Sequence, residues 1–170
     1  MPFIADNNQS TPMLEITRER TFPAPPERVW AVIEPVARLP EWFAGISFAE
    51  LISGAGVGRK QRLAGQFGKD RFELEQTVFI YEPPRRLAWR HDRELLGGRP
   101  APPMSVRVEF YIELEPVAAG TRVRLVSRQW PGSFLKKIIL RAIAPRRIGG
   151  MMEVALGKLG ALLMKSPTDA

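Results

Sequence analysis

Residues 133–164 read SFLKKIILRAIAPRRIGGMMEVALGKLGALLM, and apolar residues recur in this stretch at helical spacing in two runs. They are Leu135, Ile138, Ile139 and Ala142 in the first run, and Ile148, Met152, Ala155, Leu156, Leu159 and Leu163 in the second. Between the runs, Pro145 removes a backbone donor and crowds the preceding turn, and the second apolar stripe is rotated from the first. The segment therefore predicts a long C-terminal helix that is either bent at Pro145 or divided into two helices.

Upstream of this helix, apolar and polar residues alternate in segments that are bounded by glycine and proline. The predicted strands span residues 14–22, 46–52, 59–67, 71–81, 86–92, 104–115 and 121–130. The clearest is 104–115, where apolar residues hold the even positions from Val106 to Leu114, so we expect one face in the core and one in water. An amphipathic set of strands needs an apolar partner, and we expect the sheet to close over the C-terminal helix and to use its apolar stripe.

Two short helices are predicted between the first and second strands. Pro25 and Pro26 pre-set the first turn of a helix at residues 27–34, and a second helix at residues 36–42 contains Pro40 and is therefore short. Residues 93–103 instead carry two glycines and three prolines. We expect a loop there that acts as a lid.

The chain has 170 residues, which is the length of one domain with a core of its own. We expect a flexible tail at residues 1–12 and a single domain at residues 13–165. Cysteine is absent and His91 is the only histidine, so the composition argues against disulfides, thiolate ligands and a histidine metal site. We therefore expect no metal and no cofactor.

The formal charge at pH 7 is +7, but the basic residues are spread along the chain and mixed with acidic ones. This favours a solvated basic surface over a nucleic-acid partner. Residues 1–12 lack the basic and apolar regions of a signal peptide, and no apolar run reaches the ~18 residues of a membrane span. We expect a cytoplasmic protein without a transmembrane segment, either a monomer or a homodimer.

Six short features occur in the order that they have in one known superfamily. They are FPAPPERVW at residues 22–30, LPEW at 39–42, GAGVG at 54–58, YEPPRRL at 81–87, LEP at 114–116 with GTRV at 120–123, and the long final helix. Together with the first strand, this order resembles the START-like (SRPBCC) superfamily, and specifically its polyketide cyclase/dehydrase branch. The resemblance spans residues 14–164.

The resemblance implies an α+β helix-grip fold. In this fold a curved antiparallel sheet of seven strands wraps around a long C-terminal helix, two short helices lie between strands 1 and 2, and a cavity lies between sheet and helix. Members of the superfamily bind lipids, steroids, hormones or polyketides, and only some of them are enzymes. They share no single catalytic motif that could be carried over to this chain.

Several polar residues share strand parity with apolar ones, which would place them inside the sheet. A packed core has little use for such groups, whereas a cavity that holds an apolar ligand by a few polar contacts would use them. With one aromatic residue that shares their face, the candidate ligand-binding residues are Arg18, Arg20, Gln76, Trp89, His91, Ser127 and Gln129. The alternative is that strand ends and bulges place several of them in solvent, because a one-residue slip reverses every face. Trp89 fits a core residue as well as a ligand contact.

His91 shares parity with Leu87 and Trp89, so we expect it to face the interior. It is either a hydrogen-bonded core residue or a group that contacts a ligand or transfers a proton. No catalytic triad, carboxylate pair or metal-ligand spacing is recognisable, and the catalytic residues stay unassigned. The glycines at residues 54–58 open no helix, so they predict a hairpin turn and not a phosphate-binding loop.

These observations favour the binding of a hydrophobic small molecule, such as a lipid, a polyketide or an aromatic compound, between the sheet and the C-terminal helix. One alternative is a polyketide cyclase or dehydratase in which His91 or an inward arginine polarises a carbonyl in the same cavity. A second alternative is an accessory protein that associates with lipid or a membrane surface. It rests on the basic residues Lys136, Lys137, Arg141, Arg146 and Arg147 beside an apolar helix.

Overall fold

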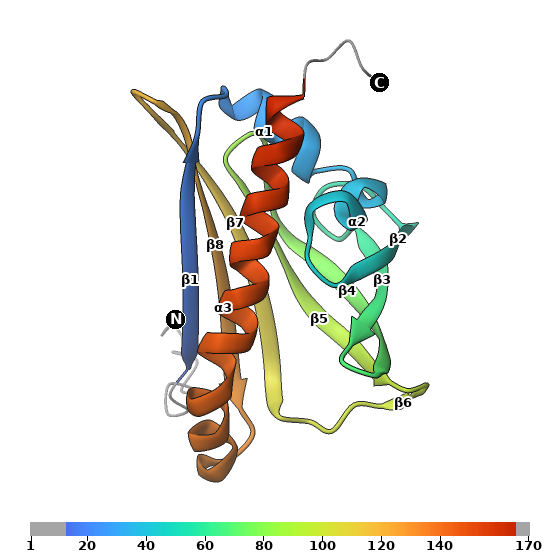
Figure 1. Ribbon diagram of the computed structural model, residues 1–170. Helices are drawn as coiled ribbons and strands as arrows, with labels where there is room; N and C mark the ends of the chain where they lie inside the picture. Colours follow the sequence, from blue (N-terminus) through green and yellow to red (C-terminus); the bar gives the residue numbers. More distant parts are fainter. Residues whose placement is uncertain (1–12, 166–170) are drawn as a thin grey trace, which may run out of the picture.

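The structure, a computed structural model, describes residues 13–165 (Figure 1). Its strands are β1 (Leu14–Phe22), β2 (Ile46–Ser53), β3 (Lys60–Phe67), β4 (Asp70–Glu82), β5 (Arg86–Leu96), β6 (Arg99–Pro100), β7 (Ser105–Val117) and β8 (Gly120–Pro131). Its helices are α1 (Pro26–Ile33), the 3-10 turn η1 (Val36–Arg38), α2 (Leu39–Trp42) and α3 (Phe134–Met164). The tail predicted at residues 1–12 lies outside the described residues.

The strands form one antiparallel sheet in the order β1-β8-β7-β5-β4-β3-β2, and the two-residue strand β6 pairs with β5. The chain crosses from the edge strand β1 through α1, η1 and α2 to the other edge strand, β2, and then returns strand by strand to β8. The long helix α3 lies along β1 and β8 on one side of the curved sheet, and α1 and α2 pack on the same side (Figure 1). This is the α+β helix-grip fold that the sequence predicts. We call the face that α3 covers the inner face of the sheet.

The core lies between the inner face and the second half of α3. Leu125, Ile112 and Leu87 are direct neighbours on β8, β7 and β5 and are almost completely buried. Leu156 and Leu159 of α3 are fully buried in the same core. Burial of one such side chain stabilises the fold by about 1.5–3 kcal/mol, so this region supplies much of the stability.

The short helices begin where proline places them. Pro26 and Pro40 stand in the first turns of α1 and α2, where the missing backbone donor costs nothing. Val29 of α1 and Trp42 at the end of α2 are fully buried. These helices therefore cover the part of the inner face that α3 leaves open.

The helix α3 is unbroken from Phe134 to Met164, so the prediction that Pro145 could divide it in two is wrong. Its start is capped by the Ser133 hydroxyl, which accepts a hydrogen bond from the Lys136 backbone N–H at 3.3 Å. Ala144 and Met152 are buried on the two sides of Pro145. Such packing offsets the ~3 kcal/mol that an internal proline costs.

The expectation that the core uses the whole apolar stripe of α3 is also wrong. Apolar side chains of its first three turns are exposed, and they are Phe134, Leu135, Ile138, Ile139 and Ile143. Figure 1 shows these turns reaching past the end of β1. The sheet therefore grips only the second half of the helix.

The alternation predicted for residues 104–115 fails at its start, and the middle of the face that was predicted to meet water is buried. Val106, which was predicted to face the core, is 75% exposed next to a register shift at the start of β7. Glu109 and Tyr111 were predicted to face water and are buried, because Tyr111 belongs to a second apolar cluster on the outer face. The Tyr111 hydroxyl donates a hydrogen bond of 2.6 Å to Glu109 Oε2, which pairs the buried carboxylate.

The lid predicted at residues 93–103 is partly a hairpin. Residues 93–96 continue β5, and Leu95 and Leu96 pair with Pro100 and Arg99 of β6. Gly97 and Gly98 have φ angles of 58° and 75°, which allow this tight turn. The glycines therefore extend the sheet where the sequence suggested a free loop.

Candidate functional site

A row of polar side chains crosses the inner face of the sheet. Gln61 of β3 lies opposite Gln76 of β4, and Gln76 lies opposite His91 of β5. Further along the same level, Gln129 of β8 lies opposite Val108 of β7. Directly opposed residues project from the same face of an antiparallel sheet. We call Gln61, Gln76, His91 and Gln129 the polar row.

The centre of the polar row is a buried pair of amides. Gln61 Nε2 donates a hydrogen bond of 2.9 Å to Gln76 Oε1, and both residues are almost completely buried. Among the described residues, Gln61 Oε1 has no hydrogen-bond partner, and neither has the indole N–H of the buried Trp42. An unpaired buried polar atom costs about 1–3 kcal/mol. Arg59 Nε is a third buried polar atom without a partner, so the described interior contains one acceptor and two donors that a bound molecule can satisfy.

Four aromatic rings border the polar row, and we call them the aromatic wall. Trp89, two positions before His91, stacks on Phe110 with the ring centroids 5.3 Å apart. The Phe43 ring meets Phe110 edge-on at 5.2 Å and Trp42 at 5.4 Å. Trp89 is thus both a core residue and part of the surface that surrounds the polar row.

A β-bulge brings Glu94 to the same face as His91. Gln76 pairs with His91 and Leu74 pairs with Glu94, so the register shifts by one residue between them. After such a bulge the residues that face inward change from odd to even positions. His91 is half-buried, and its Nδ1 lies 2.5 Å from Glu94 Oε1.

This His91–Glu94 pair has the geometry of a proton-transfer group. The hydrogen bond from His91 lowers the pKa of Glu94 below its ordinary value, against the opposing effect of burial. A carboxylate that accepts the Nδ1–H of an imidazole fixes the ring orientation and leaves Nε2 to exchange a proton with another group.

The two candidate arginines lie apart from the polar row. Arg18 Nε lies 3.1 Å from Glu153 of α3, and Arg20 Nη2 lies 3.6 Å from the other oxygen of the same carboxylate. Arg18 Nη1 also donates to the carbonyl oxygen of Thr17 at 2.8 Å. The pair therefore ties the edge strand β1 to α3.

Ser127 and Gln129 are buried on β8. Ser127 lies between Ile16 of β1 and Phe110 of β7, within the core. Gln129 Oε1 accepts a hydrogen bond of 3.3 Å from the Ser105 hydroxyl. The structure thus gathers Gln76, His91 and Gln129 at one level, with Trp89 and Ser127 one level further into the core.

The residues that the sequence analysis missed are Gln61, Glu94 and Arg59. Arg59 is buried directly before β3 and pairs with Glu34 at 2.7 Å. The Tyr81 hydroxyl donates to the same carboxylate at 3.3 Å, and burial followed by the Glu34 charge raises the pKa of Tyr81. The parity of residues 59–65 would have placed Arg59 and Gln61 inside, whereas nothing in the sequence indicates the bulge that turns Glu94 inward.

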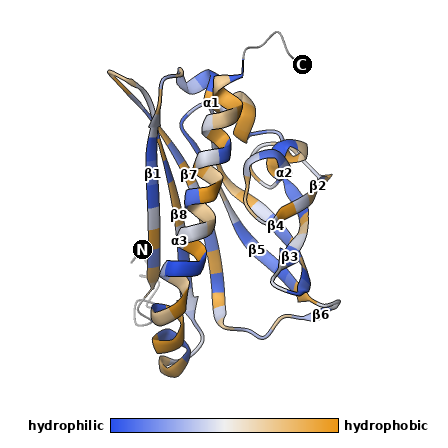
Figure 2. Cartoon of the chain, in the orientation of Figure 1, coloured by the Kyte–Doolittle hydropathy of each residue, from blue (hydrophilic) through white to orange (hydrophobic). Residues whose placement is uncertain are grey.

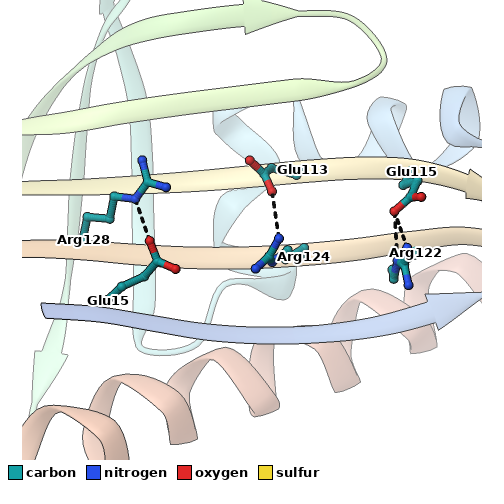
Figure 3. A network of polar contacts seen from close by, with 6 residues as sticks. All are labelled: Glu15, Glu113, Glu115, Arg122, Arg124 and Arg128. Carbon is teal, nitrogen blue, oxygen red and sulfur yellow. Dashed lines mark hydrogen bonds and ion pairs between the residues drawn. The ribbon is translucent and has the colours of Figure 1, made fainter.

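The outer face carries a groove of about 480 Å³ that is lined almost entirely by charged residues. Its lining residues are Glu19, Arg85, Arg86, Glu113, Leu114, Glu115, Arg122 and Arg124. Figure 3 shows the ladder of ion pairs across β7, β8 and β1, with Arg122 and Glu115 only 2.5 Å apart. Exposed pairs of this kind contribute about 0–1 kcal/mol each, and their charges cancel, so the ladder offers no strong site for an ion.

Within residues 13–165, no cluster of histidine, cysteine, aspartate and glutamate side chains is suited to hold a metal ion. Across the same residues, none of the helices combines the length and the apolarity needed to cross a membrane.

The family model described as "Polyketide cyclase / dehydrase and lipid transport" matches residues 13–163. The chain therefore belongs to this family, which is the branch that the sequence resembles. No curated protein matches the chain.

Solved structures with the same fold have low sequence identity to this chain. TTHA0849 from Thermus thermophilus is 18% identical with a TM-score of 0.70, and the match covers 89% of this chain and 97% of that one. CV1439 from Chromobacterium violaceum is 19% identical with a TM-score of 0.63, covering 89% and 99%. Ara h 8.0201 is 13% identical with a TM-score of 0.64, covering 88% and 99%. These similarities establish the fold alone.

Proposed function

We propose that the protein binds a hydrophobic small molecule, such as a lipid, a polyketide or an aromatic compound, against the polar row and the aromatic wall. The observation that carries this proposal is the buried Gln61–Gln76 pair with its unpartnered acceptor. A core selected only for packing would hold apolar residues there, because unpaired amides are costly. Membership of a family described by polyketide cyclisation and lipid transport supports the same conclusion, since both activities handle largely apolar molecules.

The chemistry of the site favours a neutral ligand with a hydroxyl group over a free acid. Gln61 Oε1 needs a donor and the Trp42 indole needs an acceptor, and a hydroxyl supplies both functions. The charge of the buried Arg59 is already balanced by Glu34 at 2.7 Å, although its Nε–H has no partner. A carboxylate at this nitrogen would add a second negative charge beside Glu34, which a neutral hydroxyl avoids.

Native mass spectrometry of the freshly purified protein tests the proposal first, by detecting a co-purified molecule. An anilinonaphthalene sulfonate dye should also bind the folded protein saturably and be displaced better by a long-chain alcohol than by the matching fatty acid. The double variant Gln61→Leu/Gln76→Leu should fold and lose the preference for the alcohol. A folded wild-type protein that binds neither the dye nor an apolar alcohol contradicts the proposal.

A second candidate function, a polyketide cyclase or dehydratase that acts on a molecule bound at the polar row, is favoured by the His91–Glu94 pair. With Glu94 holding Nδ1, His91 Nε2 is placed to remove a proton from a carbon next to a carbonyl group, or to return one to a leaving hydroxyl. Turnover of a poly-β-ketone mimic should then be lost in His91→Ala and reduced in Glu94→Gln. If the wild-type protein binds the mimic without turning it over, only the first function, ligand binding, is supported.

Three further expectations concern the location of the protein, its oligomeric state and its partners. We infer a cytoplasmic protein that acts as a monomer or homodimer. We also infer that it has no nucleic-acid partner, because outside residues 133–152 its basic residues are dispersed among acidic ones. Size-exclusion chromatography with light scattering decides the oligomeric state.

A further inference from the structure

The first three turns of α3 expose a continuous apolar surface, which we call the apolar ridge. Its members are Phe134, Leu135, Ile138, Ile139 and Ile143, with exposures between 38% and 76%. Figure 2 shows the apolar colouring of these turns at the end of the helix that projects past β1. Large apolar side chains that are exposed together usually mark an interaction surface.

The ridge has the geometry of an amphipathic helix that lies flat on a surface. At 3.6 residues per turn, the ridge residues and Ala142 spread over an arc of about 180°. Leu140 and the buried Ala144 lie on the opposite side, which faces the protein. The apolar arc is therefore presented to the outside as one face.

Basic residues flank this arc on both sides. Arg141 lies about 20° beyond one edge of the arc and Lys136 about 20° beyond the other. Lys136 Nζ also donates to the carbonyl oxygen of Pro103 at 2.5 Å, which fixes the start of the helix to the segment before β7. Residues 133–152 contain five basic residues and no acidic one, and the first acidic residue of the helix is Glu153.

We propose that the apolar ridge docks the protein on an anionic lipid bilayer, with the ridge among the acyl chains and the basic residues at the headgroups. An apolar arc flanked by Lys and Arg is the pattern of interfacial helices. The charge argues against a second copy as the occupant, because a two-fold contact would bring both sets of basic residues together without acidic partners from residues 133–152. Bilayer docking is independent of the proposed ligand site, which lies inside the sheet.

Vesicle flotation of the full-length protein tests the proposal. The protein should float with vesicles of equimolar phosphatidylcholine and phosphatidylglycerol and stay unbound with phosphatidylcholine alone. Leu135→Glu/Ile138→Glu should abolish flotation, and Arg141→Glu should weaken partitioning about tenfold or more, with the loss reduced at high salt. Matched controls on the exposed side of the second half, Val154→Glu and Lys158→Glu, should bind as the wild type does.

Three results overturn the proposal. The first is equal binding to neutral and anionic vesicles, and the second is unchanged flotation of the folded Leu135→Glu/Ile138→Glu variant. The third is absence of vesicle binding together with a dimer that this double variant dissociates in sedimentation velocity, which assigns the ridge to a second copy. Each variant should fold, because all the substituted positions are exposed. Far-ultraviolet circular dichroism checks this.

Discussion

The inner face of the sheet has two regions that are built from the same strands and differ in chemistry. In one region, Leu125, Ile112 and Leu87 pack against the second half of α3. In the other, Gln129, His91, Gln76 and Gln61 occupy the corresponding inward positions. The apolar region explains stability without any reference to a ligand. The polar region costs stability in isolation, which is the reason to assign it a function.

The largest loss of stability is expected from a substitution in the apolar region. Leu156→Ala should lower the free energy of unfolding by about 2–5 kcal/mol, because it opens a cavity at a fully buried position. Val154→Ala, at a position of the same helix that is 52% exposed, is the matched control and should change it little. Urea denaturation measures both. Equal effects of the two substitutions would mean that the sheet does not grip the helix as described.

A single substitution in the polar row should have the next largest effect. Gln61→Leu should destabilise the protein by about 1–3 kcal/mol, because it leaves Gln76 Oε1 buried without its donor. The double variant Gln61→Leu/Gln76→Leu removes both partners and should recover most of this loss. Thermal melting of the three proteins checks the order. A double variant that is as unstable as the sum of the single ones would show that the pair is not isolated in the core.

The substitution His91→Ala tests whether a residue of the polar row serves binding more than stability. Although only 18% of the His91 side-chain surface is exposed, a histidine that faces a ligand site loses few packing contacts, so the substitution should cost less than about 1 kcal/mol of stability. It should nevertheless weaken binding of the apolar dye severalfold, because His91 lies beside Gln76 in the polar row. Measuring the melting curve and the dye affinity of the same variant decides whether His91 is a ligand contact or a core residue. A loss of about 1–3 kcal/mol with unchanged affinity would make His91 a core residue only.

The smallest expected effect is a dependence of the stability on pH, which comes from Glu94. Because its pKa is lowered in the folded protein, Glu94 contributes stability above the ordinary pKa of about 4.3, and this contribution is lost as the pH falls through the lower folded value. Glu94→Gln removes the contribution. The difference in melting temperature between wild type and Glu94→Gln should therefore shrink from neutral pH to below about pH 4. A difference that grows on acidification would contradict the His91–Glu94 contact.

The fold was predictable because each element carries its own signal. Proline and glycine mark the ends of α1, α2 and most strands, and the period of the apolar residues separates the strands from α3. Pro145 gave a false signal, since local propensity predicted a possible break and tertiary packing keeps the helix continuous. The apolar pattern of residues 135–142 also indicated burial, although the helix there extends past the sheet.

The candidate site was predictable only in part. Strand parity correctly predicted that Gln76 and Gln129 face inward, and it also predicted that His91 lies on this face. The bulge that turns Glu94 inward depends on pairing between two strands, which no single strand reveals. Arg18 and Arg20 were chosen by the same parity, but their partner Glu153 lies on α3, more than a hundred residues away in the sequence.

The most direct test of the central claim is an amide NMR titration of the labelled protein with a long-chain alcohol. The account predicts saturable shift changes that cluster at Gln61, Gln76, His91 and Gln129 and are absent from the outer groove around Arg122. These changes should disappear in the folded Gln61→Leu/Gln76→Leu variant. Shift changes confined to the outer face, or no saturable change in the folded wild-type protein, would contradict the assignment of the polar row as a binding site.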